Sequence, residues 1–283
     1  MLSLTLGIIA ALAWGVHDVC VRFVTARVGV PVALMVVLAT GLIILTPLTI
    51  WIADWGALNP AASFASVATG LIYSLGYYGL YRAFAIGPVR LVAPVTGAFP
   101  ILSLAWAAAQ GQPPTLGQIG AVVAIVAGVG LTAALSDQDD SQGNGSTKAA
   151  LCWAVLAACG FALTFAVGQF ASASGAVVTS LLISRLVAFA ALLTATLLIT
   201  GRPRLGSGVP WKLLLAMGAC DALALSLVLA AGSLPNPEFA SVASSTFGMV
   251  TILLAWGFLK EKMTPPQWGA VAMVFAGIGY LAL

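Results

Sequence analysis

Long apolar runs follow one another along the 283 residues, and each run is bounded by glycine, proline or charged residues. A single run is about 20 residues long, which is the length that an α-helix needs to cross the hydrocarbon core of a bilayer. The runs are nearly continuous and do not alternate between apolar and polar positions, as the strands of a membrane barrel would. The pattern predicts ten transmembrane helices, at about residues 3–24, 31–53, 62–86, 89–110, 115–135, 148–172, 176–200, 210–232, 238–259 and 265–283.

Composition supports a membrane environment. Charged residues make up 7% of the chain and hydrophobic residues 61%, whereas soluble domains carry about 25% charged residues. This excludes a water-soluble enzyme, a nucleic-acid-binding protein and a disordered protein. We therefore expect an all-α polytopic membrane protein whose surrounding partner is lipid. The four cysteines fall inside predicted helices, so we expect no disulfide and no metal site, and no motif indicates a cofactor.

The positive charges predict the orientation of the chain. Ten Lys and Arg residues lie in or beside loops on one side of the ten-helix scheme, whereas the other side carries only Asp54 and Glu238. Loops rich in Lys and Arg stay in the cytoplasm. We expect a multi-pass inner-membrane protein with a cytoplasmic linker and both termini in the periplasm. The ten cations are Arg22, Arg27, Arg82, Arg90, Lys148, Arg202, Arg204, Lys212, Lys260 and Lys262.

One long polar stretch, from Ser136 to Lys148, divides the chain. We expect five helices in residues 1–135, a polar linker at 136–147 and five helices in residues 148–283. The last helices of the two halves share a pattern, GAVVAIVAGVGLTA from Gly120 and GAVAMVFAGIGYLA from Gly269, which indicates a duplication. Because five is odd, the second copy crosses the membrane in the opposite sense. Inverted repeats indicate a secondary transporter with its site between the halves; a scaffold or a channel is the alternative.

Short motifs occur in order along both halves. They are Ala13-Trp14-Gly15 followed by Arg22, then Ser184-Arg185-Leu186, and finally Phe258-Leu259-Lys260-Glu261 followed by Pro265, Gly269 and Gly277. With these motifs the chain resembles the ten-helix EamA-type permeases of the drug/metabolite transporter superfamily. The resemblance implies an exporter of amino acids, related metabolites or drugs. The departures are Thr40 and Gln112, where the first half lacks the arginine and the glutamate, and Cys159-Gly160 in place of Trp-Gly.

Tyrosines form one face of the third predicted helix. Tyr73, Tyr77 and Tyr81 are spaced four residues apart, so their side chains lie on one side of the helix. Tyr73 and Tyr77 are too deep for the interfacial position that tyrosine usually takes. They form either a wall of the substrate site or an interhelical packing surface with bonded hydroxyls. We expect Tyr81, which precedes Arg82, to be an interface anchor.

Other candidates for substrate contact lie near the middle of their helices. Trp14 belongs to the helix-1 motif, whereas Phe99, Phe161 and Phe247 are more simply explained by packing. The helix at 238–259 also holds hydroxyls at Ser241, Ser244, Ser245 and Thr246, which are available to a substrate or to neighbouring helices. Pro94 and Pro100 interrupt the helix at 89–110. They predict a hinge beside the site, or else a fixed kink.

Four ionisable side chains, His17, Asp18, Arg185 and Asp221, are expected inside the bilayer, where such groups are costly and functional by default. Asp18 is spaced to pair with Arg22 one turn later. His17 is then left for the cavity, where it is compatible with substrate binding, with proton transfer or with a bond to a carbonyl group. For Arg185 and Asp221 we favour a structural ion pair over separate contacts with the two charged ends of an amino acid.

We expect a secondary transporter that exports small amphiphilic metabolites by alternating access, amino acids with aromatic or other apolar side chains above all. The alternative is a flippase for lipids or lipid-linked metabolites with the same fold. A membrane-embedded enzyme is disfavoured because the acidic residues are dispersed.

No phosphate-binding loop occurs, so transport runs on a gradient or downhill, and His17 and Asp221 are the candidates for proton coupling. The partners are lipid and a small-molecule substrate, without nucleic acid. The oligomeric state stays open and is compatible with a monomer.

Overall fold

The computed structural model describes residues 2–109, 111, 113–137, 147–201, 208–260 and 263–281, and every regular element in these ranges is helical. The linker predicted at 136–147 lies almost wholly outside the described residues. Seven of the described helices are long and apolar enough to cross a membrane. Together with α3, the α4–α5 pair and α12, they account for all ten predicted spans. The fold is that of an all-α polytopic membrane protein.

The helix bounds agree with the predicted ranges to within four residues, and the largest difference is at the end of the first helix, expected at residue 24 and observed at Val28. The first half contains α1 (Leu2–Val28), α2 (Val30–Ile52), α3 (Pro60–Ile86), α4 (Val89–Thr96), α5 (Pro100–Ala109) and α6 (Leu116–Asp137). The second half contains α7 (Thr147–Ser172), α8 (Val177–Thr200), α9 (Trp211–Ala230) with the short turn η1 (Ala231–Ser233), α10 (Glu238–Ser244), α11 (Phe247–Leu254) with the π-helical turn η2 (Ala255–Leu259), and α12 (Pro265–Leu281).

Local sequence explains where several helices begin and end. Asn59 caps α3, since its side-chain oxygen accepts a hydrogen bond from the backbone N–H of Ala62 at 2.8 Å, and Pro60 follows at the first helical position. Gly29 has φ of 76°, a left-handed conformation that lets the chain turn at once from α1 into α2. Tight turns of this kind keep consecutive helices antiparallel.

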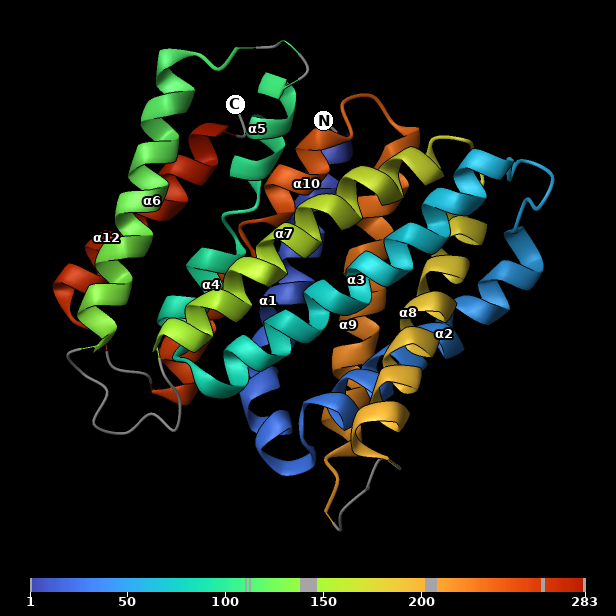
Figure 1. Cartoon of the computed structure of the whole chain (residues 1–283), viewed down its shortest axis with the longest axis horizontal. Coiled ribbons are helices and arrows are strands. Elements are labelled where there is room, and N and C mark those ends of the chain that lie inside the picture. The colour runs from blue at the N-terminus through green and yellow to red at the C-terminus, as the bar shows by residue number, and fades with distance from the viewer. Residues whose placement is uncertain are drawn as a thin grey trace.

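The two halves run in opposite directions through the molecule. In Figure 1, α1 leads away from the end where both termini lie, whereas α7 leads toward that end. The same end carries the loop with Asp54 and the start of α10 at Glu238, and the opposite end carries the turns beside Arg27, Arg90 and Lys260. The five-helix repeats are therefore inverted. The described charges separate between the two ends as the sequence predicts.

Helices of each repeat pack against helices of the other repeat. α1 packs against α9, α10 and α11, while α7 packs against α3 and α4, the corresponding helices of the first repeat. α2 also packs against α9 and, in the corresponding way, α8 packs against α3. Two pairs of counterparts meet directly, α2 with α8 and α6 with α12. This is the arrangement expected when an inverted two-fold relation places α1 on α7.

Two spans are broken near the middle, one in each repeat. Pro100 has no N–H to bond to the carbonyl of Thr96, and the backbone between α4 and α5 uses shorter-range bonds, from the N–H of Ala98 to the oxygen of Val95 at 3.2 Å and from that of Ile101 to the oxygen of Ala98 at 3.1 Å. Pro94 lies inside α4 and Pro100 begins α5. The interruption predicted between these prolines is present; its movement stays a prediction.

The break between α10 and α11 occurs without proline. Each of the three hydroxyls of Ser244, Ser245 and Thr246 donates to the carbonyl three residues back, at 2.6–2.7 Å. Such bonds compete with the regular helical ladder and bend the helix. The two broken spans cross at their interruptions, because a Cβ on Gly97 would lie 2.8 Å from the carbonyl oxygen of Ser245.

A close approach of the two repeats, between α3 and α7, predicts a sensitive position. A Cβ on Gly76 would lie 2.9 Å from the Cα of Gly160, and neither backbone has a flexible side chain to move aside. We expect Gly76→Ala to destabilise the protein by about 1–3 kcal/mol through overpacking, measured as a lower midpoint of thermal unfolding in detergent. Gly130→Ala is the matched control, because a Cβ there meets nothing within 4 Å. Equal midpoints for the two variants would contradict this account of the interface.

Candidate functional site

A buried cavity lies between the repeats, with walls from two helices of each. α1 and α3 contribute Trp14, Asp18, Tyr77 and Leu80, and α7 and α11 contribute Phe161, Phe165 and Phe247. Every lining residue is at most 5% exposed. The cavity has room for about one water molecule, so a larger occupant requires the walls to separate.

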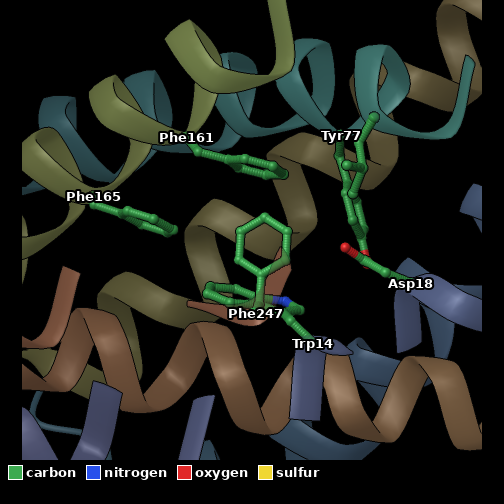
Figure 2. Close-up of a pocket in the computed structure, with 7 residues that line it drawn as sticks. Trp14, Asp18, Tyr77, Phe161, Phe165 and Phe247 are labelled. Carbon is green, nitrogen blue, oxygen red and sulfur yellow. The ribbon is translucent and has the colours of Figure 1, made fainter. Parts of the chain in front are cut away.

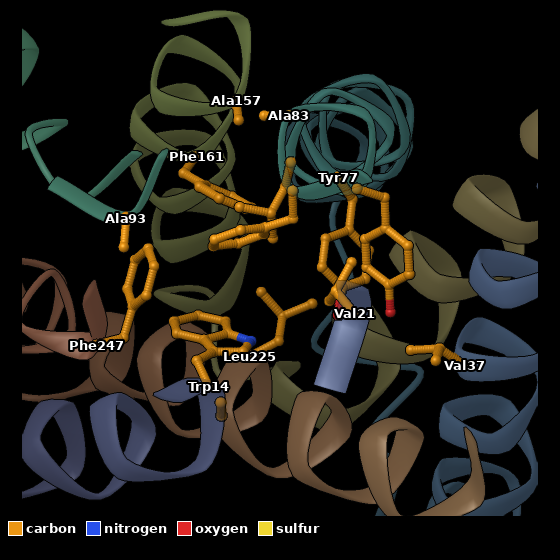
Figure 3. Packing of buried hydrophobic residues seen from close by; sticks show 14 of the residues in the cluster. Trp14, Val21, Val37, Tyr77, Ala83, Ala93, Ala157, Phe161, Leu225 and Phe247 are labelled. Carbon is orange, nitrogen blue, oxygen red and sulfur yellow. The ribbon is translucent and has the colours of Figure 1, made fainter. Parts of the chain in front are cut away.

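Aromatic rings make up one side of the cavity. The ring of Trp14 lies 5.6 Å from that of Phe165 and 6.2 Å from that of Phe247, and Phe161 and Phe165 stack nearly parallel with centroids 6.0 Å apart. Figure 3 shows Trp14, Phe161 and Phe247 within the wider hydrophobic core. Offset and edge-to-face pairs at these distances are favourable beyond the area that they bury. The result is an aromatic box formed by Trp14, Phe161, Phe165 and Phe247.

An ion pair lies on the other side of Trp14. The Nη1 of Arg185 donates to the Oδ2 of Asp221, and its Nη2 donates to the backbone oxygen of Asp221 at 3.0 Å. The Oδ1 of Asp221 also accepts bonds from the hydroxyl of Tyr73 at 2.5 Å and from the Nε1 of Trp14 at 3.1 Å. Both charged side chains are 0% exposed. The pair favoured from the sequence is present, and Tyr73 has a bonded hydroxyl.

A second polar cluster joins α1 to α3. The Nδ1 of His17 lies 2.7 Å from the Oδ1 of Asp18, and its Nε2 lies 2.7 Å from the hydroxyl of Tyr77 and 2.8 Å from that of Tyr81. The Oδ2 of Asp18 is buried and accepts no hydrogen bond from the described residues. Figure 2 shows the Asp18 carboxyl group pointing toward the aromatic side chains.

Three expectations about these residues were wrong. Asp18 bonds to His17 and not to Arg22, because the ring of the preceding residue reaches its carboxyl group. For the same reason His17 is not left alone in the cavity. Tyr81 is 0% exposed and bonded to His17, so it is not an interface anchor. Its place on the face shared with Tyr77 outweighs its position next to Arg82.

Two further candidates lie outside the cavity lining. Phe99 packs behind the box, with its ring 5.2 Å from that of Phe165. Ser244 is buried, and its hydroxyl donates to the carbonyl of Ser241 in its own helix. Trp14, Tyr77 and Phe247 do line the cavity. His17 lies one hydrogen bond behind it, through Asp18, and Tyr73 lies two behind it, through Asp221 and Trp14.

Sequence reasoning missed Leu80 and Phe165 as lining residues. Phe161 and Phe165 are four residues apart on α7 and therefore share a face. This spacing is the same signal that singled out the tyrosines on α3, and it was available in the sequence.

Comparison with known proteins places this architecture in a family. A model described as the EamA-like transporter family matches residues 1–134 and again residues 148–283. The chain belongs to the EamA-like transporter family. It is a membrane transporter built from two EamA repeats, and the resemblance indicated by the short motifs is confirmed.

Solved structures show the same fold for this EamA-family chain. One of them, described as "Crystal structure of protein", is 16% identical in sequence and has a TM-score of 0.65. The similarity covers 98% of this chain and 95% of that chain. A search of the curated proteins found no match.

The Arg185–Asp221 pair predicts a double-mutant pattern in this EamA transporter. Asp221→Asn leaves the Arg185 charge unpaired, and Arg185→Gln leaves Asp221 unpaired, so we expect each to destabilise the protein by about 3–5 kcal/mol. The double variant buries no unpaired charge and should recover more than half of that loss. Unfolding in detergent measures the free energies, with Asp54→Asn as the control for an exposed carboxylate. Additive losses in the double variant would show that the two side chains are not coupled.

Proposed function

We propose that this EamA transporter exports small amphiphilic metabolites by alternating access through the cavity between its repeats. The observation that carries the proposal is the composition of that cavity, with an aromatic box on one side and the Asp18 carboxyl group on the other. A compact molecule with an apolar group and a polar group matches these two surfaces. Amino acids with aromatic or other apolar side chains are the first class to test.

Burial of the cavity favours a small substrate over a lipid. The lining side chains are almost completely enclosed by protein, whereas a lipid needs a continuous path for its chains at the protein surface. The cavity is also smaller than a metabolite. Transport therefore requires a conformational cycle in which the walls separate toward one side of the membrane and then toward the other.

The two broken spans supply a structural basis for that cycle. α4–α5 and α10–α11 cross where their regular hydrogen bonding is interrupted, and Phe247 of the cavity wall is the first residue of α11. Rotation of α11 about its break would move a wall of the cavity, and rotation about the break between α4 and α5 would move Phe99, which packs behind that wall. We propose that these breaks act as the hinges, with Pro94 and Pro100 fixing the one in the first repeat.

Transport in liposomes tests this function. We expect the purified protein to move amino acids with apolar side chains, and a pH gradient to change the rate if protons are coupled. Phe161→Ala removes one ring of the box and should raise KM for an aromatic substrate about tenfold through lost stacking and burial. Phe170→Ala is the matched control, because this side chain lies on the same helix and is 62% exposed. If no compound of a broad panel of amino acids and related amphiphiles is moved, the proposed function is wrong.

The separation of charges supports a cytoplasmic location for the basic end. We propose that the protein lies in the inner membrane, with the linker in the cytoplasm and both termini in the periplasm. A reporter that is active only in the cytoplasm should be inactive when fused to the C-terminus and active when inserted in the linker. The opposite pattern would invert the orientation, while leaving the fold unchanged.

A further inference from the structure

The charges around the cavity do not balance. Arg185 and Asp221 neutralise each other, and Asp18 adds one acidic group beside the aromatic box. A carboxylate so deeply buried requires a bound proton or a cationic partner, since burial of an uncompensated charge is costly. The cavity thus has a place for one additional positive charge.

Asp18 has one oxygen engaged and one available. Its Oδ1 is bonded to His17, whereas its Oδ2 accepts no hydrogen bond from the described residues although Asp18 is only 1% exposed. The carboxyl group points toward Phe161 and Phe247 in the cavity (Figure 2). An acceptor for an ammonium group therefore lies next to rings whose faces attract cations.

Among the described residues, the cavity lining offers no free hydrogen-bond donor to a substrate carboxylate. Arg185 donates two of its nitrogens to Asp221, and its Nε, which has no partner among the described residues, belongs to a side chain that does not line the cavity. Of the donors in the lining, the Nε1 of Trp14 is bonded to Asp221 and the hydroxyl of Tyr77 is bonded to His17. An anionic group that entered would therefore meet Asp18 without a compensating cation.

We propose that the cavity binds the ammonium group of an aromatic or apolar amine at Asp18, and that this cation exchanges with a proton held by the His17–Asp18 pair. The inference rests on the proposed function and specifies its substrate class: an organic cation, with a carboxylate unnecessary and unfavourable. When the proton is present, both ring nitrogens of His17 donate, to Asp18 and to a tyrosine hydroxyl. When the amine binds, His17 is neutral, its Nδ1 still donates to Asp18, and its Nε2 accepts from Tyr77 or Tyr81.

The titratable groups on the surrounding helices leave the His17–Asp18 pair as the place for the exchanged proton. α3 presents Tyr73, Tyr77 and Tyr81, α9 presents Asp221 and Cys220, α8 presents Arg185, and α1 itself adds Cys20 and Arg22. α7, which also lines the cavity, carries the partly exposed thiol of Cys159. α2 and α11 contain no titratable residue, and Glu238 of α10 is exposed at the end of the molecule away from the basic loops. Asp221 is already bonded to Arg185, Tyr73 and Trp14. One cation bound therefore displaces one proton.

A set of three ligands tests the charge preference directly. Phenylalanine, 2-phenylethylamine and 3-phenylpropanoate share the ring and its two-carbon spacer, but they are zwitterionic, cationic and anionic. Titration calorimetry of the purified full-length protein in buffers of different ionisation enthalpy measures both affinity and protons released. We expect 2-phenylethylamine to bind at least about tenfold more tightly than phenylalanine, with about one proton released and tighter binding as the pH rises. We expect no measurable binding of 3-phenylpropanoate.

The order of affinities for the three ligands is measured in the unmodified protein, so this test remains decisive even if a variant fails to fold. Asp18→Asn should lower affinity for the amine at least about tenfold and abolish proton release, while Asp54→Asn, an exposed counterpart, should change neither. Phenylalanine or 3-phenylpropanoate binding as tightly as the amine, or amine binding unchanged in a folded Asp18→Asn variant, would overturn the inference. Transport of these ligands in that case, with dependence on Phe161, would leave the proposed function intact. Absence of transport for any amphiphile in the broader panel would remove both.

Discussion

A lipid bilayer offers no partner to a polar group, so each charge within this chain must find one inside the protein. The carboxylate of Asp221 shows how much structure this constraint imposes. It accepts bonds from Arg185 on α8, from Trp14 on α1 and from Tyr73 on α3, while it is carried by α9. Four helices from both repeats are thereby fixed around one side chain. Apolar packing in lipid could accept many arrangements of similar helices, but this set of donors accepts few.

The same constraint governs the backbone at the two broken spans. A helix interrupted in contact with lipid would expose unpaired N–H and carbonyl groups. Here the interruptions face each other inside the protein, with Gly97 close to Ser245 and Gly248 close to Ala93. Three-residue backbone bonds, and hydroxyl bonds in the second repeat, satisfy groups that the regular ladder leaves out. Irregular backbone is thus tolerated where the protein needs it, beside the cavity.

Sequence patterns predict the parts of this structure that depend on composition. The ten helices follow from the length of the apolar runs, and the Arg185–Asp221 pair follows from the cost of an unpaired charge in lipid. The side of each helix that faces the protein interior is harder to predict, because an apolar helix in lipid has no polar face to orient it. The position of Tyr81 next to Arg82 therefore misleads toward the interface, and the sequence does not show that Phe165 faces the cavity. The break at Ser245 depends on the rotamers of hydroxyl side chains, and no proline marks it in the sequence.

The repeats share a fold but divide the chemistry between them. The first repeat has Thr40 at the position where EamA permeases have the arginine, according to the resemblance. The hydroxyl of Thr40 donates to the carbonyl of Val36 in the same helix. In α7 the counterpart of Trp14 is Cys159, and the aromatic residues are Phe161 and Phe165 instead. A symmetric sequence would present the same groups from both repeats. The divergence instead places the Asp18 carboxyl group on α1 and the phenylalanine rings on α7 and α11, so the two sides of the cavity differ in polarity. This difference comes from the divergence of the two sequences, because two identical inverted repeats would present the same groups on both sides.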